Sequence, residues 1–319
     1  MIAALSLDAD NQWSYMKTHG DAGWESFPSY LDVLLPHACD LLDTLGLKIT
    51  FFVVGQDAAL PENRAALSLI GARGHEVGNH SFRHEPWLHR YSRAELKEEL
   101  GRAEDAIGEA CSLRPVGFRG PGFSLSTDVL ETLADRGYRY DGSTLPTWIG
   151  PLARAYYFRA AKLSAEQREE RSMLFGQASE GLRPNRPYRW RLPSGRYMLE
   201  LPVTTIPGLK TPFHLSYLLY LARISDRLLD AYLSVAIAAC RQSRTPPSFL
   251  LHPLDLLGGD QVPELRFFPG MDLDAARKRD LFLHVIGRLK AAFEILPMNV
   301  YAERIGAQAD LPIRDADST

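Results

Sequence analysis

Two histidines four residues apart, His80 and His84, carry the first chemical signal in the sequence. On one turn of helix, side chains four apart project from the same face, so both rings could bind one metal ion. A zinc-type ion takes imidazole nitrogens at about 2.0–2.1 Å. The pair alone is weak support, because solvated or core histidines show the same spacing. A metal site therefore depends on what the rest of the chain supplies.

Two carboxylates follow a short apolar run at residues 2–7. Asp8 and Asp10 are two residues apart, so on an extended chain both side chains point to the same side. The apolar run is typical of a strand buried on both faces, where an acid is costly unless it has a partner. The two acids are therefore candidates for a site at a strand end. The alternative is a surface turn with two solvated acids.

The elements that must position these residues alternate along the chain between apolar, β-branched runs and amphipathic segments. This pattern predicts an α/β fold with a mainly parallel sheet, either open or closed into a barrel. We expect strands at 2–7, 48–54, 75–78, 116–119, 138–141, 197–203, 248–251 and 295–301, and helices at 29–45, 62–73, 92–111, 127–136, 213–240 (one or two) and 273–293. Sites in α/β folds assemble at strand ends. The polar residues at or just after such ends are Asp8, Asp10, His80, His84, Arg119, Asp141 and His252.

We predict that residues 1–305 form a single domain. The alternation of strands and helices is interrupted once, at 146–196. We interpret this Arg-, Tyr-, Trp- and Pro-rich segment as an insertion or flap over one end of the sheet. Its arginines either meet a phosphate or an acidic sugar, or stay solvated. Residues 306–319 are polar, and we expect a frayed tail there.

Bulk composition narrows the classes of partner. The 319 residues are 45% hydrophobic, enough for a large core, and the net charge of −3 argues against nucleic acid as the main partner. Cys39, Cys111 and Cys240 form no Cys-x-x-Cys pair and are expected to be buried thiols. With no secretory signal at the N-terminus, they predict a cytoplasmic protein. Charges interrupt the apolar stretch at 213–240, so we expect no spanning helix, and peripheral membrane contact stays a minority interpretation.

Six segments resemble, in the same order, the motifs of the polysaccharide deacetylase family, also called the NodB-homology family or carbohydrate esterase family four. The likeness runs from about residue 3 to residue 305, outside the insertion. The first acidic motif resembles the Asp-x-Asp variant, in which one residue separates the two acids. The six segments are 7–10 (Leu-Asp-Ala-Asp), 50–55 (Thr-Phe-Phe-Val-Val-Gly), 74–84 (Gly-His-Glu-Val-Gly-Asn-His-Ser-Phe-Arg-His), 118–124 (Phe-Arg-Gly-Pro-Gly-Phe-Ser), 138–143 (Tyr-Arg-Tyr-Asp-Gly-Ser) and 250–253 (Leu-Leu-His-Pro).

This resemblance implies a fold and a metal site. The fold would be a distorted (β/α) barrel of about seven mainly parallel strands. Asp10, His80 and His84 would hold a divalent metal with one position open for water, as a catalytic zinc site requires. Zinc is the first expectation, but two imidazoles and a carboxylate also accept cobalt, nickel or iron.

The same resemblance implies catalytic roles for three further residues. Asp8 would act as the general base that takes a proton from water, and Arg119 would keep Asp8 charged and correctly aimed. His252 would protonate the departing amine, which leaves poorly as an anion. Together these residues would catalyse attack of water on an amide.

Substrate contacts are expected around the loop that follows the expected strand at 116–119. A backbone N–H near Gly122 or Phe123 would stabilise the oxyanion, although many relatives carry an aromatic residue where this chain has Gly122. Asp141 either orients a neighbouring site group or is a buried structural acid. Trp13 lies in a polar and aromatic segment that suits a loop lining a sugar-binding cleft or a packed loop. The candidate substrate-binding residues are Trp13, Pro121, Gly122, Phe123 and Asp141.

The leading hypothesis is a metal-dependent hydrolase that removes an N-acyl group, first of all N-acetyl, from an aminosugar in a polysaccharide or a lipid-linked glycan. A second hypothesis is hydrolysis of a small non-sugar amide in a closed pocket with few aromatic residues. A third is a non-catalytic carbohydrate-binding relative that kept the fold. The presence of both Asp8 and His252 argues against the third, because a pure binder needs neither a base nor an acid.

Overall fold

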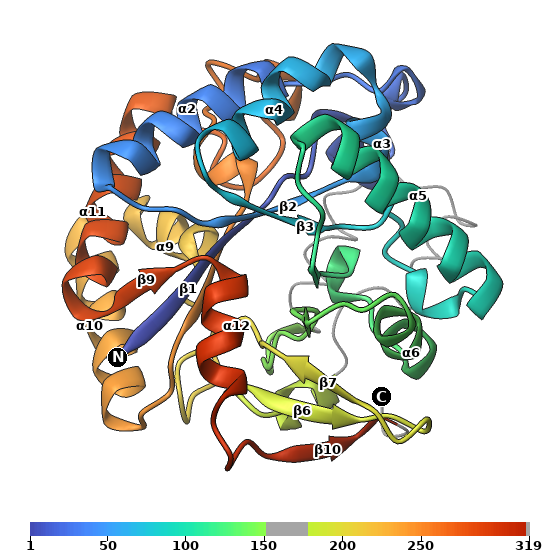
Figure 1. Ribbon diagram of the computed structural model, residues 1–319. Coiled ribbons are helices and arrows are strands. Elements are labelled where there is room, and N and C mark those ends of the chain that lie inside the picture. The colour runs from blue at the N-terminus through green and yellow to red at the C-terminus, as the bar shows by residue number, and fades with distance from the viewer. Residues whose placement is uncertain (151–177, 317–319) are drawn as a thin grey trace.

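A ten-stranded sheet runs through the centre of the protein. The computed structural model describes residues 1–150 and 178–316 (Figure 1). The strands follow the order β10-β6-β7-β5-β4-β3-β2-β1-β8, and β9 also pairs with β1. Their bounds are β1 (Ile2–Asp8), β2 (Thr50–Val53), β3 (Glu76–Asn79), β4 (Gly117–Phe118), β5 (Tyr140–Asp141), β6 (Tyr188–Arg191), β7 (Tyr197–Glu200), β8 (Ser248–Leu251), β9 (Glu294–Leu296) and β10 (Ile313–Asp315).

Neighbouring strands are parallel except for β6 and β7, which form an antiparallel pair. The parallel register brings the carboxyl ends of the central strands to one edge. Asp8 and His252 each follow the last residues that pair between β1 and β8. His80 and Arg119 each follow the pair that joins β3 to β4. The sheet therefore collects these four polar residues along a single edge.

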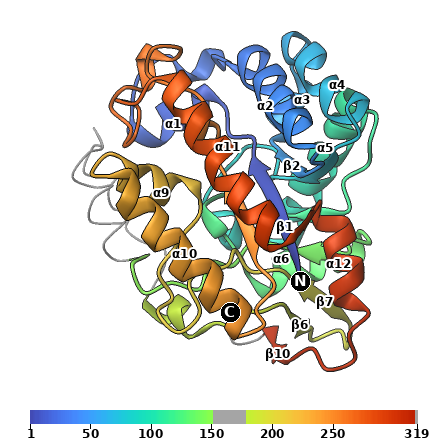
Figure 2. The same cartoon turned by 90° about the vertical axis from the view of Figure 1, so that its left-hand side faces the viewer.

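Helices cover the sheet through separate apolar clusters. The largest cluster joins β1, β2 and β8 to α2, α4, α9, α10 and α11, and Figure 2 looks onto the neighbouring helices α10 and α11. A second cluster packs α5 and α6 against the β6–β7 part of the sheet. The helices are α1 (Gln12–His19), α2 (Leu31–Leu45), α3 (Gly55–Ala59), α4 (Arg64–Ala72), α5 (Arg93–Cys111), α6 (Thr127–Asp135), α9 (Leu215–Ala222), α10 (Asp226–Gln242), α11 (Ala275–Ala292) and α12 (Met298–Gly306).

The prediction of an α/β fold with a mainly parallel sheet is confirmed, whereas closure into a barrel is not. The path of paired strands ends at β10 on one side and β8 on the other, and no pairing between described residues joins those ends. Figure 1 shows α12 between β1 and the β6–β7 pair. Its residues Met298, Tyr301 and Ile305 form an apolar cluster with Phe52 and Leu199 of the sheet. The helix thus packs against one face of the central strands.

Two segments differ from the expected elements. The loop expected around Trp13 is helix α1, which begins where the Asn11 side chain accepts a hydrogen bond from Gln12 N at 2.8 Å. The strand expected at 295–301 is only the three residues of β9, and α12 follows after Pro297. Met298 N donates to the Thr50 side chain at 2.7 Å, so a distant strand caps the start of this helix.

Part of the polar end of the chain and one short segment of the expected insertion join the sheet. The frayed tail expected at 306–319 is wrong for its described part, since β10 pairs with β6 and Ala316 is fully buried. Within 146–196, Tyr188–Arg191 forms β6 rather than a flap. The main part of that predicted insertion, at 151–177, lies outside the described residues, as do residues 317–319.

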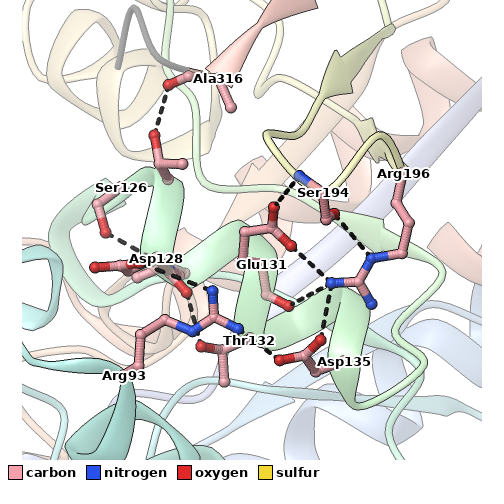
Figure 3. A network of polar contacts seen from close by, with 11 residues as sticks. Arg93, Ser126, Asp128, Glu131, Thr132, Asp135, Ser194, Arg196 and Ala316 are labelled. Atoms are coloured by element: carbon pink, nitrogen blue, oxygen red, sulfur yellow. Dashed lines mark hydrogen bonds and ion pairs between the residues drawn. The ribbon is translucent and has the colours of Figure 1, made fainter.

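A polar network fixes the β6–β7 hairpin to α6 (Figure 3). Arg196 Nη2 lies 2.6 Å from Glu131 Oε2 and 2.8 Å from Asp135 Oδ1. Glu131 also accepts a hydrogen bond from Ser194 N at 2.8 Å. Arg93 Nη2 of α5 lies 2.6 Å from Asp135 Oδ2. A continuous network of ion pairs therefore joins the hairpin, α6 and α5.

The structure also bears on the three cysteines and on the apolar character of the helices. Cys39, Cys111 and Cys240 are buried free thiols, as expected. In the parts of the chain that the structure describes, no helix combines the length and the apolar character needed to cross a membrane.

Candidate metal centre and active site

Asp10, His80 and His84 converge at the carboxyl edge of the sheet. Asp10 Oδ1 lies 3.3 Å from His80 Nε2 and 3.0 Å from His84 Nε2. Four-coordinate zinc with bonds of about 2.0–2.1 Å separates its ligand atoms by about 3.3 Å, which matches this spacing. Asp10 Oδ1 is buried and has no hydrogen-bond partner, so a cation between these atoms would satisfy it. The donor set therefore fits a divalent metal.

A sharp bend, rather than the expected helical turn, brings the two histidines together. His80 directly follows β3, and both Ser81 and His84 have positive φ, 61° and 55°. Ser81 N donates to the Asn79 side chain at 2.8 Å, and the next two backbone N–H groups donate to Glu99 Oε1 at 3.0 and 2.6 Å. Because side chains satisfy these N–H groups, the segment needs no helical hydrogen bonds.

The surroundings prepare the ligands for a cation. His80 Nδ1 lies 2.7 Å from the Arg119 carbonyl oxygen, and donation there leaves Nε2 as the metal-facing atom. Burial by itself raises the pKa of the Asp10 carboxyl. The positive charge of His84 and the close approach of both imidazoles overcome that effect and hold this pKa well below its usual value. Asp10 is therefore a carboxylate, the form that binds metal.

Asp8 forms a buried ion pair with Arg119 beside this cluster. Arg119 Nη1 lies 2.5 Å from Asp8 Oδ1 and 2.9 Å from Ser6 Oγ, and its Nε donates to the Gly142 carbonyl at 3.0 Å. The guanidinium is 1% exposed and lies over the Phe52 ring, 4.3 Å from its centroid. Three anchors fix its plane, so Arg119 both balances and aims the Asp8 carboxylate.

His252 lies at the end of β8, half-buried, with its ring held from one side. Its Nδ1 is 3.3 Å from Ser216 Oγ, and its backbone N donates to Asp255 Oδ2 at 2.8 Å. Lys278 is fully buried, and its Nζ donates to the Leu254 carbonyl at 2.6 Å. The lysine thus fixes the turn that follows His252, a contact for which the sequence shows no local signal.

A second histidine, His214, lies beside His252, with ring centroids 5.9 Å apart. Its ring is buried, and its Nδ1 has no hydrogen-bond partner. Burial, followed by the charges of His252 and Arg119, lowers the pKa of His214 well below its usual value. His214 is therefore neutral and packs against the predicted acid without competing for its proton.

The turn after β4 presents a glycine to the outside. Pro121 is buried, Phe123 is half-buried and Gly122 is exposed with a φ of 57°. Phe123 N donates to the Gly120 carbonyl at 2.9 Å, so that N–H is engaged within the turn. Gly122 therefore remains the better candidate of the two for an oxyanion donor. The positive φ explains why a residue without a side chain suits this place.

Trp13 is not placed to contact substrate, so this prediction is wrong. Its side chain is 1% exposed, and its Nε1 donates to Asp57 Oδ1 at 2.8 Å. The ring packs edge-on against His84, with centroids 6.3 Å apart. Burial raises the pKa of Asp57 to about 7, against hydrogen bonds from Asn11 and Trp13 that lower it. Trp13 therefore supports a metal ligand from behind.

Asp141 is also withdrawn from any substrate. It is 0% exposed, and its Oδ1 accepts a hydrogen bond from Ser143 Oγ at 2.6 Å. Ser143 Oγ in turn accepts from Gly120 N at 2.8 Å. The prediction of a direct substrate contact is therefore wrong, and the alternative of an orienting role is compatible with these bonds.

Comparison with known proteins identifies relatives of this chain. The profile of the family described as polysaccharide deacetylase matches residues 21–140. A chitooligosaccharide deacetylase from Bradyrhizobium sp. (strain ANU 289) is 38% identical over 112 residues, which are 34% of this chain and 46% of that protein. Another from Sinorhizobium fredii (strain NBRC 101917 / NGR234) is 32% identical over 136 residues, 40% of this chain and 61% of that protein. The chain thus spans about half the length of these two curated relatives.

A solved structure extends the match to the whole fold. A Mycobacterium smegmatis protein assigned as a polysaccharide deacetylase superposes with a TM-score of 0.63 and 19% identity, covering 98% of this chain and 92% of that one. At this level of identity the likeness shows a shared fold. The profile and the two relatives add the sequence likeness, which includes the segment that carries His80 and His84. Residues 21–140 of this chain therefore resemble the polysaccharide deacetylase, or NodB-homology, family in sequence, and the whole chain shares the fold of the Mycobacterium smegmatis protein.

Proposed function

We propose that this protein is a metal-dependent hydrolase that removes an N-acyl group, first of all N-acetyl, from an aminosugar in a polysaccharide or a lipid-linked glycan. The observation that carries the proposal is the meeting of two arrangements at one sheet edge. The Asp10–His80–His84 cluster lies beside the buried Asp8–Arg119 pair. The names of the curated relatives support the substrate class.

The chain's own residues divide the chemistry among them. A divalent metal held by Asp10, His80 and His84 would supply Lewis-acid activation of water and of the amide carbonyl. Zinc is proposed first, with cobalt, nickel or iron as alternatives. Asp8 accepts the proton that water loses, and Arg119 keeps the Asp8 carboxylate in one orientation.

Formation of the tetrahedral species needs a stabilised oxyanion, and its collapse needs a protonated leaving group. The exposed Gly122 N–H is the proposed backbone donor to the oxyanion. His252 gives a proton to the amine nitrogen as the C–N bond breaks. Because Ser216 faces His252 Nδ1, the proton is proposed to leave from Nε2.

One observation keeps a second candidate substrate under test. The burial of Trp13 removes the aromatic residue that was expected to line an open sugar groove. Hydrolysis of a small non-sugar amide therefore stands as the alternative function. Location in the cytoplasm also remains a proposal, for which cell fractionation of the tagged protein is the test.

The deciding experiment measures acyl release by metal-loaded protein from N-acetylglucosamine oligomers, lipid-linked aminosugars and small amides. We expect acetate from the sugar substrates, loss of release with chelator, and a fall in kcat of at least about 10²-fold in Asp8→Asn. The matched control is Asp280→Asn, which removes an exposed carboxylate on α11. Release from small amides alone would select the second candidate. Metal binding without release from any substrate would indicate a non-catalytic relative.

A further inference from the structure

Two carboxyl groups face each other inside the sheet, away from the metal cluster. Asp141 of β5 is paired in register with Glu200 of β7, and both side chains are 0% exposed. Glu200 Oε1 accepts a hydrogen bond from Thr144 Oγ1 at 2.7 Å, and its Oε2 accepts from Trp190 Nε1 at 3.0 Å. Asp141 Oδ2 is buried without a hydrogen-bond partner, and the Glu200 carboxyl lies next to it across the β5–β7 pair.

This arrangement requires a proton. Two carboxylates in contact cannot both stay ionised in a dry interior, and a hydrogen bond between them needs one acid form. Burial is the first cause that raises the pKa of Glu200 well above its usual value, and the nearby Asp141 adds to it. Burial also raises the pKa of Asp141, but the interactions with Glu200 and Ser143 offset part of that effect, so its pKa is raised less than that of Glu200 and the proton belongs mainly to Glu200.

Few other charges face the pair. From β6, the buried Tyr188 and Trp190 pack beside Glu200, and Arg183 lies 6.0 Å from the Trp190 ring. From the end of β4, Arg119 acts on Asp141 through its charge, but its guanidinium is already bonded to Asp8, Ser6 and Gly142. Within residues 1–150 and 178–316, the nearby guanidinium groups bond to other partners, which leaves the proton as the means of neutralising Glu200 there.

The pair connects to the active site through one serine. Ser143 Oγ donates to Asp141 Oδ1 at 2.6 Å, which leaves its oxygen to accept from Gly120 N at 2.8 Å. Gly120 begins the turn that exposes Gly122. Two hydrogen bonds therefore lead from Asp141 to the backbone of the proposed oxyanion site, and a bond from Glu200 to Asp141 would extend them to Glu200.

We propose that Glu200 is a positioning residue that acts in its protonated form. It donates a hydrogen bond to Asp141, and Asp141 through Ser143 holds the Gly120 backbone and so the turn that bears Gly122. The proposal rests on the proposed hydrolase function for its effect on rate. Its structural part does not depend on that function.

The proton is tested first, without any substrate. An acid whose pKa is raised by folding stabilises the protein fully below its unfolded pKa, about 4.3 for Glu, and that stabilisation is lost as pH rises toward the folded pKa. The unfolding equilibrium constant of the wild type should therefore increase with pH more steeply than that of Glu200→Gln, by up to tenfold per pH unit above pH 5. Equal slopes in the two proteins would overturn the proposal.

The positioning effect is tested by amide hydrogen exchange of the Gly120–Ser124 segment. Ser143→Ala and Glu200→Leu should both speed exchange in this segment, whereas Glu200→Gln, whose amide can donate to Asp141, should change it less than threefold. Arg196→Ala is the control, because it loosens the neighbouring hairpin without touching Ser143. If Glu200→Leu does not fold, Ser143→Ala and Glu200→Gln still decide the point. Unchanged exchange in Ser143→Ala would refute the connection.

The rate is tested by a double-variant cycle in kcat. Glu200→Leu and Ser143→Ala should each lower kcat by about tenfold with little change in KM, and the double variant should be hardly slower than either, because both break one chain of bonds. Additive losses would show that Glu200 acts by another route and would overturn the positioning role. A wild type with no activity on any substrate would count against the proposed function, while the pH slope and the exchange data would still decide the fate of Glu200.

Discussion

The guanidinium of Arg119 is the most connected charged group of the candidate site. The guanidinium donates hydrogen bonds to Asp8, Ser6 and the Gly142 carbonyl. The backbone carbonyl of Arg119 accepts a hydrogen bond from His80. One residue therefore links the predicted base to a predicted metal ligand. Only a planar group with several donors can make these contacts together, which gives a sharp expectation for its replacement.

Arg119→Lys should lower kcat by about 10²-fold, because a single ammonium cannot hold Asp8 in the orientation set by three anchors. Zinc affinity should change little, since the contact with His80 comes from the backbone. Steady-state kinetics and metal titration measure the two effects. Arg191→Lys, on an exposed part of β6, is the control. Full activity in Arg119→Lys would mean that Asp8 needs no aiming.

Asp57 gives a prediction for pH. Its pKa is raised to about 7 by burial, so its contribution to stability is complete below the unfolded pKa near 4 and disappears as pH rises to about 7. Over that window the wild-type free energy of unfolding should fall by up to about 1.4 kcal/mol per pH unit more than that of Asp57→Asn. Urea unfolding between pH 4 and 8 is the measurement. Parallel curves would show that Asp57 is ionised throughout.

At the scale of elements, α12 depends on residues far away in the chain. Met298 N donates to Thr50 Oγ1 at 2.7 Å, and Asn299 N donates to Glu76 Oε2 at 2.8 Å. Both groups are orphan donors of a helix start, and two strands of the sheet satisfy them. The apolar residues of α12 in turn pack against Phe52 of β2 and Leu199 of β7. Its position is therefore coupled to the centre of the fold.

Thr50→Val should reduce the free energy of unfolding by about 1–3 kcal/mol, because it leaves the Met298 N–H buried without a partner. Chemical denaturation gives the value. Thr44→Val, at an exposed place on α2, should change stability by less than about 0.5 kcal/mol. Equal effects of the two substitutions would show that the Thr50 hydroxyl does not cap α12.

At the scale of the whole molecule, the metal cluster joins segments from two strand ends, and a third strand end supports it. Asp10 follows β1, and His80 and His84 follow β3, while Arg119 after β4 holds His80 from behind. A ligand that binds only the folded state raises stability in proportion to the logarithm of its concentration. Metal loading should therefore be visible as a gain in global stability.

Adding Zn²⁺ to chelator-treated protein should raise the free energy of unfolding by about 2.7 kcal/mol at a hundredfold excess over Kd. His84→Gln should lose most of this gain, and His284→Gln, an exposed histidine on α11, should keep it. Thermal unfolding with and without the metal measures the shift in Tm. The same shift in His84→Gln as in the wild type would place the metal elsewhere.

Much of the fold follows from patterns along the chain. The predicted strands at 2–7, 48–54 and 248–251 agree closely with β1, β2 and β8, because short apolar runs between helical segments are typical of buried strands. Parallel strands then place their carboxyl ends together. For that reason Asp10, His80 and His84 can be grouped from their positions in the sequence, and the fold does bring them within reach of one ion.

The sequence by itself therefore determined the α/β class, the family motifs and the three candidate ligands, all of which rest on local patterns and on order along the chain. Only the tertiary structure decided that Trp13 is buried, that Asp141 lies beside Glu200 and that α12 takes the second part of the strand expected at 295–301. These features depend on contacts between distant segments. The Asp141 and Glu200 carboxyl groups come together, and Thr50 caps α12, only when distant segments pack and exclude water from these groups.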